Sequence, residues 1–253
     1  MKKHLLYSFF LLVVLLTAWE VVVRIRSIPE LILPTPSVIL MDIIQLVKSG
    51  FIWPHLRVTV IEIIAGFLIG SLVGLLLGVT VSQSSLLNKV LHPYIIASQA
   101  MPKLALAPLF VLWFGYGILP KLLIIALICF FPLFESSLTG LRLVDGEKVD
   151  LFRSLKASKL QILWKLRIPV AIPYIFSGMK VAIVLSVVGA VVSEFIGASE
   201  GLGALIIVAQ GSMDTPMIFS SFLLLTAIGV SCYQIMDVLE KKLFKKYTFH
   251  RRN

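Results

Sequence analysis

The sequence predicts an all-α integral membrane protein with about six transmembrane helices, since a lipid-exposed backbone must satisfy its own hydrogen bonds. Of its 253 residues, 58% are hydrophobic and only 14% are charged, whereas soluble domains carry about 25% charged residues. The mean hydropathy is +1.00. Several apolar runs reach the roughly 20 residues that a helix needs to cross a bilayer, and their continuity excludes the alternating pattern of a transmembrane β-barrel.

The first part of the chain predicts one span, a connector and an amphipathic helix. No small-x-small cleavage site follows the apolar run Leu5–Val23, so we expect an uncleaved anchor. A Pro-rich connector covers Ser27–Pro36, and Pro36 with Ser37 is a typical helix start. From there to Ser49 the apolar residues repeat with a helical period, which predicts a helix along the membrane interface.

Four straight spans are expected beyond the amphipathic helix. They cover Val58–Val81, Leu119–Gly140, Ile172–Ile196 and Pro216–Met236. In the first of these, glycine recurs at every fourth residue, at positions 66, 70, 74 and 78. Such a row of small residues lets a second helix approach closely.

The apolar region Pro93–Gly115 differs from these spans because three prolines and Lys103 interrupt it. A proline inside a helix removes a hydrogen bond and clashes with the preceding turn, so we expect a broken helix. Irregular backbone at membrane depth is tolerated only against protein or a water-filled cavity. This places Lys103 beside a pathway through the membrane; a structural ion pair with Glu62 or Glu135 is the alternative.

Charged side chains inside apolar spans are functional candidates, because they are costly in lipid. Four lie deep in the predicted spans and are assigned to the pathway: Glu62, Lys103, Glu135 and Glu194. Lys121 and Lys180 lie nearer to span ends, where a long side chain can reach the interface. Glu194 precedes the glycine-rich residues 197–203 and is interpreted as part of an external gate. A helix cap or an intersubunit hydrogen bond is the alternative for Glu194.

The placement of Lys and Arg predicts the orientation. Residues 142–167 hold seven basic side chains and the segment after Leu239 holds six, whereas residues 197–215 hold none. Because short loops rich in Lys and Arg stay in the cytoplasm, both termini and the 142–167 loop are expected there. This asymmetry explains the net charge of +10. Nucleic acid is not an expected partner, since the basic residues flank membrane spans rather than cover a separate domain.

A single transmembrane domain is expected over residues 1–253. Its parts are the first span with the external amphipathic helix (1–50), a core bundle (51–240) and a basic cytoplasmic tail (241–253).

Catalytic and metal-binding motifs are missing from the sequence. It contains no phosphate-binding loop, nucleophile elbow or zinc-protease motif. Cys129 and Cys232 fall inside spans, where cysteine acts as a small apolar residue. We expect the chain to bind no metal and no cofactor and to be no enzyme, so that any uphill transport draws its energy from a partner protein.

The polar segment between the fourth and fifth spans is basic and amphipathic. In a helix from Asp150 to Ser158, an apolar ridge of Leu151, Phe152 and Leu155 would lie opposite the basic side chains. Such a ridge suits a groove on a soluble partner; a helix lying on the membrane surface is the alternative. Asp150 near the helix start would complement the helix dipole, with plain capping as its alternative role.

The same segment resembles the cytoplasmic loop by which permease subunits of ATP-binding-cassette (ABC) importers dock onto their ATPase. The family pattern is Glu-Ala-Ala, three residues, Gly, nine residues, then Ile-x-Leu-Pro. Asp150 takes the Glu place, Lys156 the Gly place, and residues 166–169 the closing motif. Lys156 is the main departure, and we expect the helix to continue through it. The resemblance assigns these residues to the docking loop: Asp150, Leu151, Phe152, Arg153, Ser154, Leu155, Lys156, Ala157, Ser158 and Pro169.

Four further segments resemble the nitrate, sulfonate and taurine branch of these permeases: residues 33–37, 101–117, 168–178 and 193–203. The resemblance implies the type I importer permease fold and a bacterial cytoplasmic (inner) membrane location. It also implies alternating access, a dimer with a second copy of the chain, ABC ATPase subunits that bind ATP and Mg, and an extracytoplasmic solute-binding protein. The implied solutes are small, such as nitrate, sulfonates, taurine, bicarbonate or pyrimidine vitamin precursors.

A self-sufficient secondary transporter or channel is the alternative function. Secondary transporters often carry paired broken helices in two inverted repeats, whereas this chain has one strongly broken region, around Pro102. A membrane enzyme is a third possibility that lacks any catalytic constellation in the sequence.

Overall fold

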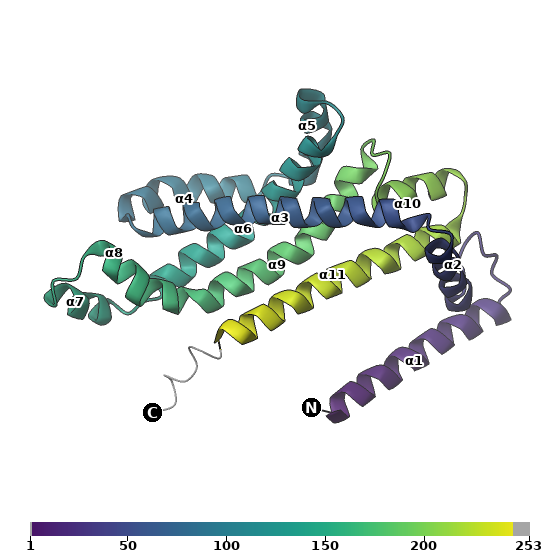
Figure 1. The fold of residues 1–253 in the computed structure, drawn as a ribbon, viewed down its shortest axis with the longest axis horizontal. Helices are drawn as coiled ribbons and strands as arrows, with labels where there is room; N and C mark the ends of the chain where they lie inside the picture. The colour runs from purple at the N-terminus through teal and green to yellow at the C-terminus, as the bar shows by residue number, and fades with distance from the viewer. Residues whose placement is uncertain (1, 245–253) are drawn as a thin grey trace. The chain divides into compact units, whose positions relative to one another are not determined.

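The computed structural model describes residues 2–244, and within that range it is helical without strands (Figure 1). Five helices are long and apolar enough to cross a membrane. Four of them are α1 (Lys2–Ile25), α3 (Ile52–Ser82), α6 (Ile118–Arg142) and α11 (Thr215–Phe244). The fifth, α9 (Ile168–Phe195), continues a shorter helical segment that begins at Lys159.

A sixth apolar region is a bent pair of helices, which confirms the predicted break. It consists of α4 (Ser85–Gln99), the 3₁₀ turn η1 (Lys103–Leu106) and α5 (Ala107–Phe114). The two halves are bent by 81°, and in Figure 1 α5 turns away from α4 at this point. Pro102 precedes η1 and Pro108 lies in the first turn of α5, where the absent N–H costs nothing. With this pair, the all-α prediction of about six spans is confirmed.

The chain forms two compact units. The N-terminal unit contains the residues up to Thr59 together with Ser199–Thr226, and the core unit contains Val60–Ala198 and the residues from Ala227 onward.

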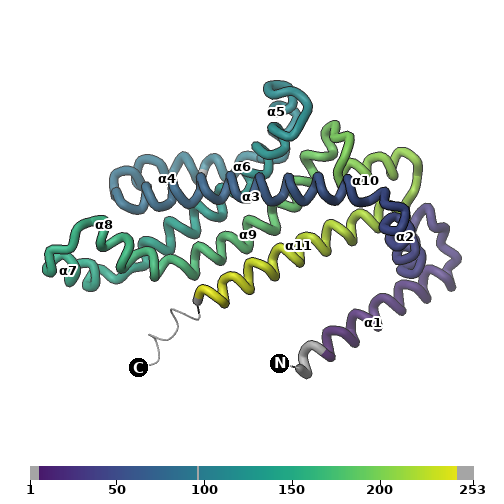
Figure 2. The backbone as a smooth tube through the Cα atoms, in the orientation of Figure 1, coloured from purple at the N-terminus to yellow at the C-terminus, as the bar shows by residue number. Residues whose placement is uncertain are grey.

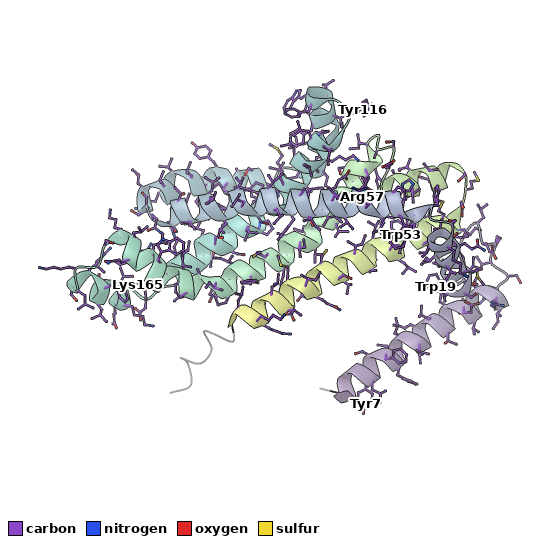
Figure 3. All side chains as sticks on the ribbon, in the orientation of Figure 1. Tyr7, Trp19, Trp53, Arg57, Tyr116 and Lys165 are labelled. Carbon is purple, nitrogen blue, oxygen red and sulfur yellow. The ribbon has the colours of Figure 1, made fainter. Side chains whose placement is uncertain are left out.

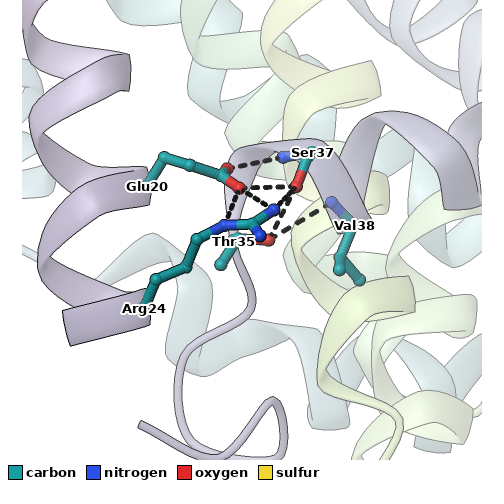
Figure 4. A network of polar contacts seen from close by, with 5 residues as sticks. All are labelled: Glu20, Arg24, Thr35, Ser37 and Val38. Carbon is teal, nitrogen blue, oxygen red and sulfur yellow. Dashed lines mark hydrogen bonds and ion pairs between the residues drawn. The ribbon is translucent and has the colours of Figure 1, made fainter. Parts of the chain in front are cut away.

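In the N-terminal unit, α2 (Pro36–Lys48) begins where the sequence predicts. Thr35 caps it by accepting a hydrogen bond from the Val38 N–H. Glu20 of α1 accepts hydrogen bonds from the Ser37 N–H (3.0 Å), the Ser37 hydroxyl (2.7 Å) and the Arg24 Nε–H (2.7 Å) (Figure 4). A carboxylate at a helix N-terminus satisfies backbone donors that have no partner inside the helix, so this network joins α1 to the start of α2.

A short helix that the sequence did not predict, α10 (Leu202–Gly211), follows the glycine-rich segment. Side chains of α3 satisfy its first backbone donors. The Gly201 N–H donates to His55 Nδ1 (3.2 Å), and the Leu202 N–H donates to Thr59 Oγ1 (2.8 Å). These bonds replace the intrahelical partners that the first turn of a helix lacks.

In the core unit, α3, α6 and α9 pack around one hydrophobic cluster. Its buried members are Ile63, Phe67, Ile125, Cys129, Leu133, Ala182, Ile183, Ala190 and Met236. The glycines of α3 face α6 closely: a Cβ atom at Gly74 would lie 2.5 Å from the Phe130 carbonyl oxygen, and one at Gly78 would lie 2.8 Å from Ser137 Cβ. The predicted close approach along this row of glycines is therefore confirmed.

Two short helices and a π-helical turn connect α6 to α9 at one end of the core unit (Figure 2). They are α7 (Gly146–Ser154), α8 (Lys159–Ile162) and η2 (Leu163–Arg167).

Candidate functional site

The predicted docking loop folds as two helices separated by a sharp turn at Lys156. Lys156 has a φ angle of 56°, in the left-handed region that favours glycine. The Lys156 N–H donates to the Arg153 carbonyl and the Ala157 N–H donates to the Phe152 carbonyl, both at 2.9 Å. This bonding pattern is a Schellman motif, whose left-handed residue is usually glycine. The prediction that the helix continues through Lys156 is wrong, because the chain ends α7 with this motif.

Lys156→Gly is therefore expected to stabilise the loop by roughly 1 kcal/mol, because a left-handed conformation costs about that much for a residue with a Cβ atom. Hydrogen-exchange protection of the amides of residues 155–158 would measure the change. Lys148→Gly, inside α7, is the matched control and should lose about 1 kcal/mol of protection. Weaker protection in Lys156→Gly would contradict the assigned turn.

The remaining polar residues of the loop hold its fold together. Asp145, not Asp150, caps α7 by accepting from the Glu147 N–H (3.2 Å). Asp150 lies in the middle of that helix and pairs with Arg153 (3.1 Å), so neither its predicted place at the helix start nor a capping role is correct. Ser158 forms a capping box with Gln161 at the start of α8.

Ser154, Ala157 and Pro169 are further predicted residues of the docking loop. The Ser154 hydroxyl donates to the Leu151 carbonyl (2.8 Å). Ala157 is half-buried in the turn, and Pro169 lies in the first turn of α9.

The apolar side chains of α7 divide between the protein interior and the outside. Val149 is buried and Phe152 is half-buried. Leu151 and Leu155 are 58% and 73% exposed. The predicted apolar ridge is thus present on the surface at Leu151 and Leu155, while Phe152 contributes only in part.

A cavity of about 600 Å³ lies in the core unit. Its walls are residues of α6 and α9 together with residues of the break between α4 and α5. Its polar lining residues are Gln99, Lys103, Glu135, Ser136 and Ser177. Most other lining residues are apolar, which is typical of a small-molecule site with a few polar groups that fix orientation.

Lys103 contributes a cation to this cavity. Its Nζ atom lies 4.2 Å from the centroid of the Phe131 ring, a cation–π geometry. Among residues 2–244, Lys103 forms an ion pair with neither Glu62 nor Glu135, so the alternative of a structural pair is wrong. Glu135 instead accepts a hydrogen bond from Gln99 Nε2 (3.2 Å) and lies 3.7 Å from His92 Nε2.

The cavity brings together two of the four predicted pathway residues, Lys103 and Glu135. Glu62 and Glu194 do not line it and are each 1% exposed. Glu62 forms an ion pair with Lys121 (2.7 Å) that joins α3 to α6. The predicted extension of Lys121 to the interface is therefore wrong.

Lys180 binds two carboxylates near the end of α11, and its predicted extension to the interface stays a prediction. Its Nζ lies 2.6 Å from Asp237 Oδ1 and also contacts Glu240. Lys121 and Lys180 thus each pair with a carboxylate on another helix. Low-dielectric surroundings favour such pairing. Within residues 2–244, no group of three or more His, Cys, Asp or Glu side chains is arranged to hold a metal ion.

Comparison with known proteins gives a consistent set of similarities. A family model described as "Binding-protein-dependent transport system inner membrane component" matches residues 66–248. A probable ABC transporter permease protein of Haemophilus influenzae is 37% identical over 94% of this chain and 97% of its own length. A putative aliphatic sulfonates transport permease protein of Bacillus subtilis is 31% identical over 92% of this chain and 84% of its own length.

Among solved structures, a chain of an amino acid ABC transporter with histidines has a similar fold. Its TM-score is 0.62 at 20% identity, and the match covers 79% of this chain and 98% of that one.

Proposed function

Because the chain belongs to the family of binding-protein-dependent transport system inner membrane components and is an ABC transporter permease of the sulfonate and taurine branch, we propose that it is the translocation subunit of an importer. In this proposal, an extracytoplasmic binding protein delivers a small solute, and a separate ATPase docks on residues 145–169. The permease family is a transport family, and the chain is a multi-pass membrane protein; in this proposal it has no cofactor of its own.

The observation that carries the docking proposal is the exposed pair of leucines on α7. Leu151 and the C-cap residue Leu155 protrude from a helix that is anchored by buried Val149 and closed by the turn at Lys156. Exposed apolar side chains clustered on a rigid, otherwise polar element mark an interaction surface. Since the sequence contains no phosphate-binding loop, we assign ATP and Mg to the docked partner.

In this proposal, movement of the docked loop is transmitted to the cavity through the two helices that the loop connects. The loop connects α6 to α9, and both helices contribute cavity walls. A loop stiffened by a Schellman turn and a capping box moves as a unit, so closure of the ATPase would act on these two helices as a rigid-body rotation. The proposed mechanism is alternating access of the cavity to the two sides of the membrane.

The proposed assembly contains a second copy of the chain, a pair of ATPase subunits and the binding protein, in a bacterial inner membrane. Both termini are placed in the cytoplasm from the Lys and Arg distribution. The proposed single permease domain keeps the three parts assigned from the sequence, 1–50, 51–240 and 241–253. Lys241 and Lys242 of the basic tail lie in the last turns of α11, whereas residues 245–253 lie outside the described part of the chain.

Replacing Leu151 and Leu155 together with Asp tests the docking surface. Both side chains are exposed, so the fold should persist, while two charges buried in the interface should reduce ATPase co-purification and ATP-driven uptake by more than about tenfold. Leu160→Asp, at an exposed leucine of α8, is the control and should keep most of both activities. Normal co-purification by the double variant would refute docking on α7. Proton- or sodium-driven uptake by the isolated subunit would instead support a secondary transporter.

Lys103→Met tests the cavity as the solute pathway. Because no carboxylate of the described residues pairs with Lys103, its removal should leave the melting temperature unchanged, while losing a charged contact should lower uptake of an anionic solute by about tenfold or more. Lys103→Arg keeps the charge and should retain most of the uptake. Glu135→Gln should not restore uptake in Lys103→Met. A lower melting temperature with normal uptake per folded molecule would show that Lys103 is structural.

A further inference from the structure

Two arginines lie together where the spans meet the connecting loop. Arg142 is the last residue of α6, and Arg167 is the last residue of the π-helical turn that leads into α9. The residues next to them, Leu141 beside Arg142 and Ile168 beside Arg167, belong to one packed cluster, which brings the two like charges to the same part of the molecule. Arg167 Nη1 also donates to the Ser82 carbonyl (3.3 Å) at the end of α3. Three helix ends thus converge on two like charges, an arrangement that an anion would stabilise.

Packing beneath the arginines fixes their positions. Leu141, Leu163 and Ala171 form a buried cluster with partly buried Val79 and Ile168. A Cβ atom at Gly140 would lie 2.8 Å from Tyr174 Cβ, so the end of α6 lies tightly against the start of α9. Leu163–Arg167 forms a π-helical turn. Such turns are rare, and they occur frequently at functional sites. Arg142 and Arg167 therefore belong to a rigid frame rather than to a loose loop.

The protein itself uses little of the hydrogen-bonding capacity of these arginines. Within residues 2–244, neither Arg142 nor Arg167 forms an ion pair with a carboxylate. The Nε atom of Arg167 is buried and has no hydrogen-bond partner in the described part of the chain. A guanidinium group carries five donors, and a buried donor without a partner is costly. A group with several negatively charged oxygen atoms, such as a phosphate, matches these donors.

The side chains around the arginines indicate where such a phosphate comes from. Leu143 directly follows Arg142, Trp164 lies one turn before Arg167, and Tyr174 lies beside Gly140; all three are exposed. Lys165, also exposed, lies at this same end of the core unit (Figure 3). Exposed Trp and Tyr beside basic residues at the ends of spans are typical of the membrane–water interface. A soluble phosphate would gain nothing from the apolar neighbours. A lipid would bind the arginines through its phosphate and the apolar side chains through its acyl chains.

We propose that Arg142 and Arg167 bind the phosphate of an anionic phospholipid, with its acyl chains against the exposed apolar side chains of Leu143 and Trp164. Basic pockets between transmembrane helices are known to accept anionic head groups. The bound lipid would neutralise the repulsion between the two arginines and hold the ends of α3, α6 and α9 together, next to the connecting loop. This site is separate from the solute cavity. It shares the 145–169 loop with the proposed docking region but uses neither Leu151 nor Leu155.

Native mass spectrometry of the purified full chain tests the site, after exchange into mixed phosphatidylglycerol and phosphatidylcholine. We expect preferential retention of phosphatidylglycerol, and a loss of about fivefold in that retention for each of Arg142→Gln and Arg167→Gln. The melting temperature should rise with phosphatidylglycerol in the native chain but not in the double variant. Lys148→Gln removes one exposed charge from the same loop and should behave like the native chain.

Three outcomes would overturn the proposal. The first is equal retention of the two lipids by the native chain. The second is an equal loss in Lys148→Gln, which would indicate a general effect of charge. The third is displacement of phosphatidylglycerol by inorganic phosphate with the same rise in melting temperature, which would identify a soluble anion as the ligand. Arg142 is exposed, so Arg142→Gln alone keeps the test valid if Arg167→Gln fails to fold.

Discussion

Lys121→Met is expected to destabilise the protein by about 3 to 5 kcal/mol, the usual cost of removing one partner of a buried ion pair. The Lys121 and Glu62 side chains are only 14% and 2% exposed, and their charged atoms lie 2.7 Å apart. Glu62 Oε1 accepts a hydrogen bond from Lys121, and Glu62 also interacts with the buried Glu194, so the lysine is the ion-pair partner of a carboxylate that lies beside a second buried carboxylate. Thermal or denaturant unfolding in detergent would measure the loss.

The identical substitution at Lys103 is the matched control, since Lys103 has no ion-pair partner among the described residues. Lys103→Met should leave stability nearly unchanged, whereas the double variant Lys121→Met with Glu62→Gln should recover most of the loss because position 62 then carries no unpaired charge. Equal destabilisation by the two single substitutions would contradict the assignment of Lys121 to a structural pair and Lys103 to the cavity.

The contrast between these two lysines shows what the sequence could and could not predict. Both are single charges in apolar regions, and their local sequences do not reveal their partners. The Lys121–Glu62 pair spans 59 residues and the Lys180–Asp237 pair spans 57, so each depends on how distant helices pack. A usable signal was present nonetheless: a lysine on an apolar helix needs a carboxylate within reach unless it lines water.

Features that depend on local sequence were predicted well. Continuous apolar runs predict spans, the prolines around Lys103 predict a break, and the glycine row of α3 predicts close packing. The structure confirms all three. The short helix α10 was missed because the apolar residues 204–209, between Gly203 and Gly211, also fit a connector.

The position of the loop between α6 and α9 was predicted, but its backbone was not. Its spacing matched the family pattern, yet the helical period was extended through Lys156, where a Schellman turn ends α7. The family glycine at this place has a physical reason, because the turn requires a left-handed residue. The motif was thus a better guide to backbone conformation than amphipathic periodicity.

Gly70→Ala is expected to destabilise the packing of α3 against α6 by about 3 kcal/mol. A Cβ atom at Gly70 would overlap the backbone of Ala126, because it would lie 2.8 Å from the Ala126 Cα atom and 2.9 Å from the Ala126 carbonyl carbon. A flexible side chain could rotate away, but the backbone of a packed helix cannot, so the two helices would have to separate. Separation would loosen the contacts of α6, which forms part of the cavity wall. Unfolding in detergent and ATP-driven uptake would both be measured.

Gly229→Ala is the control for Gly70→Ala, because it makes the same change inside another span. A Cβ atom there would meet Val187 at 3.6 Å, an ordinary contact, so stability should stay the same or rise by up to about 1 kcal/mol. Adding Ala126→Gly to Gly70→Ala should not rescue it, since the overlap is with backbone atoms that glycine retains. Full rescue by Ala126→Gly, or equal stability of Gly70→Ala and Gly229→Ala, would show that α3 and α6 are not in backbone contact at this position.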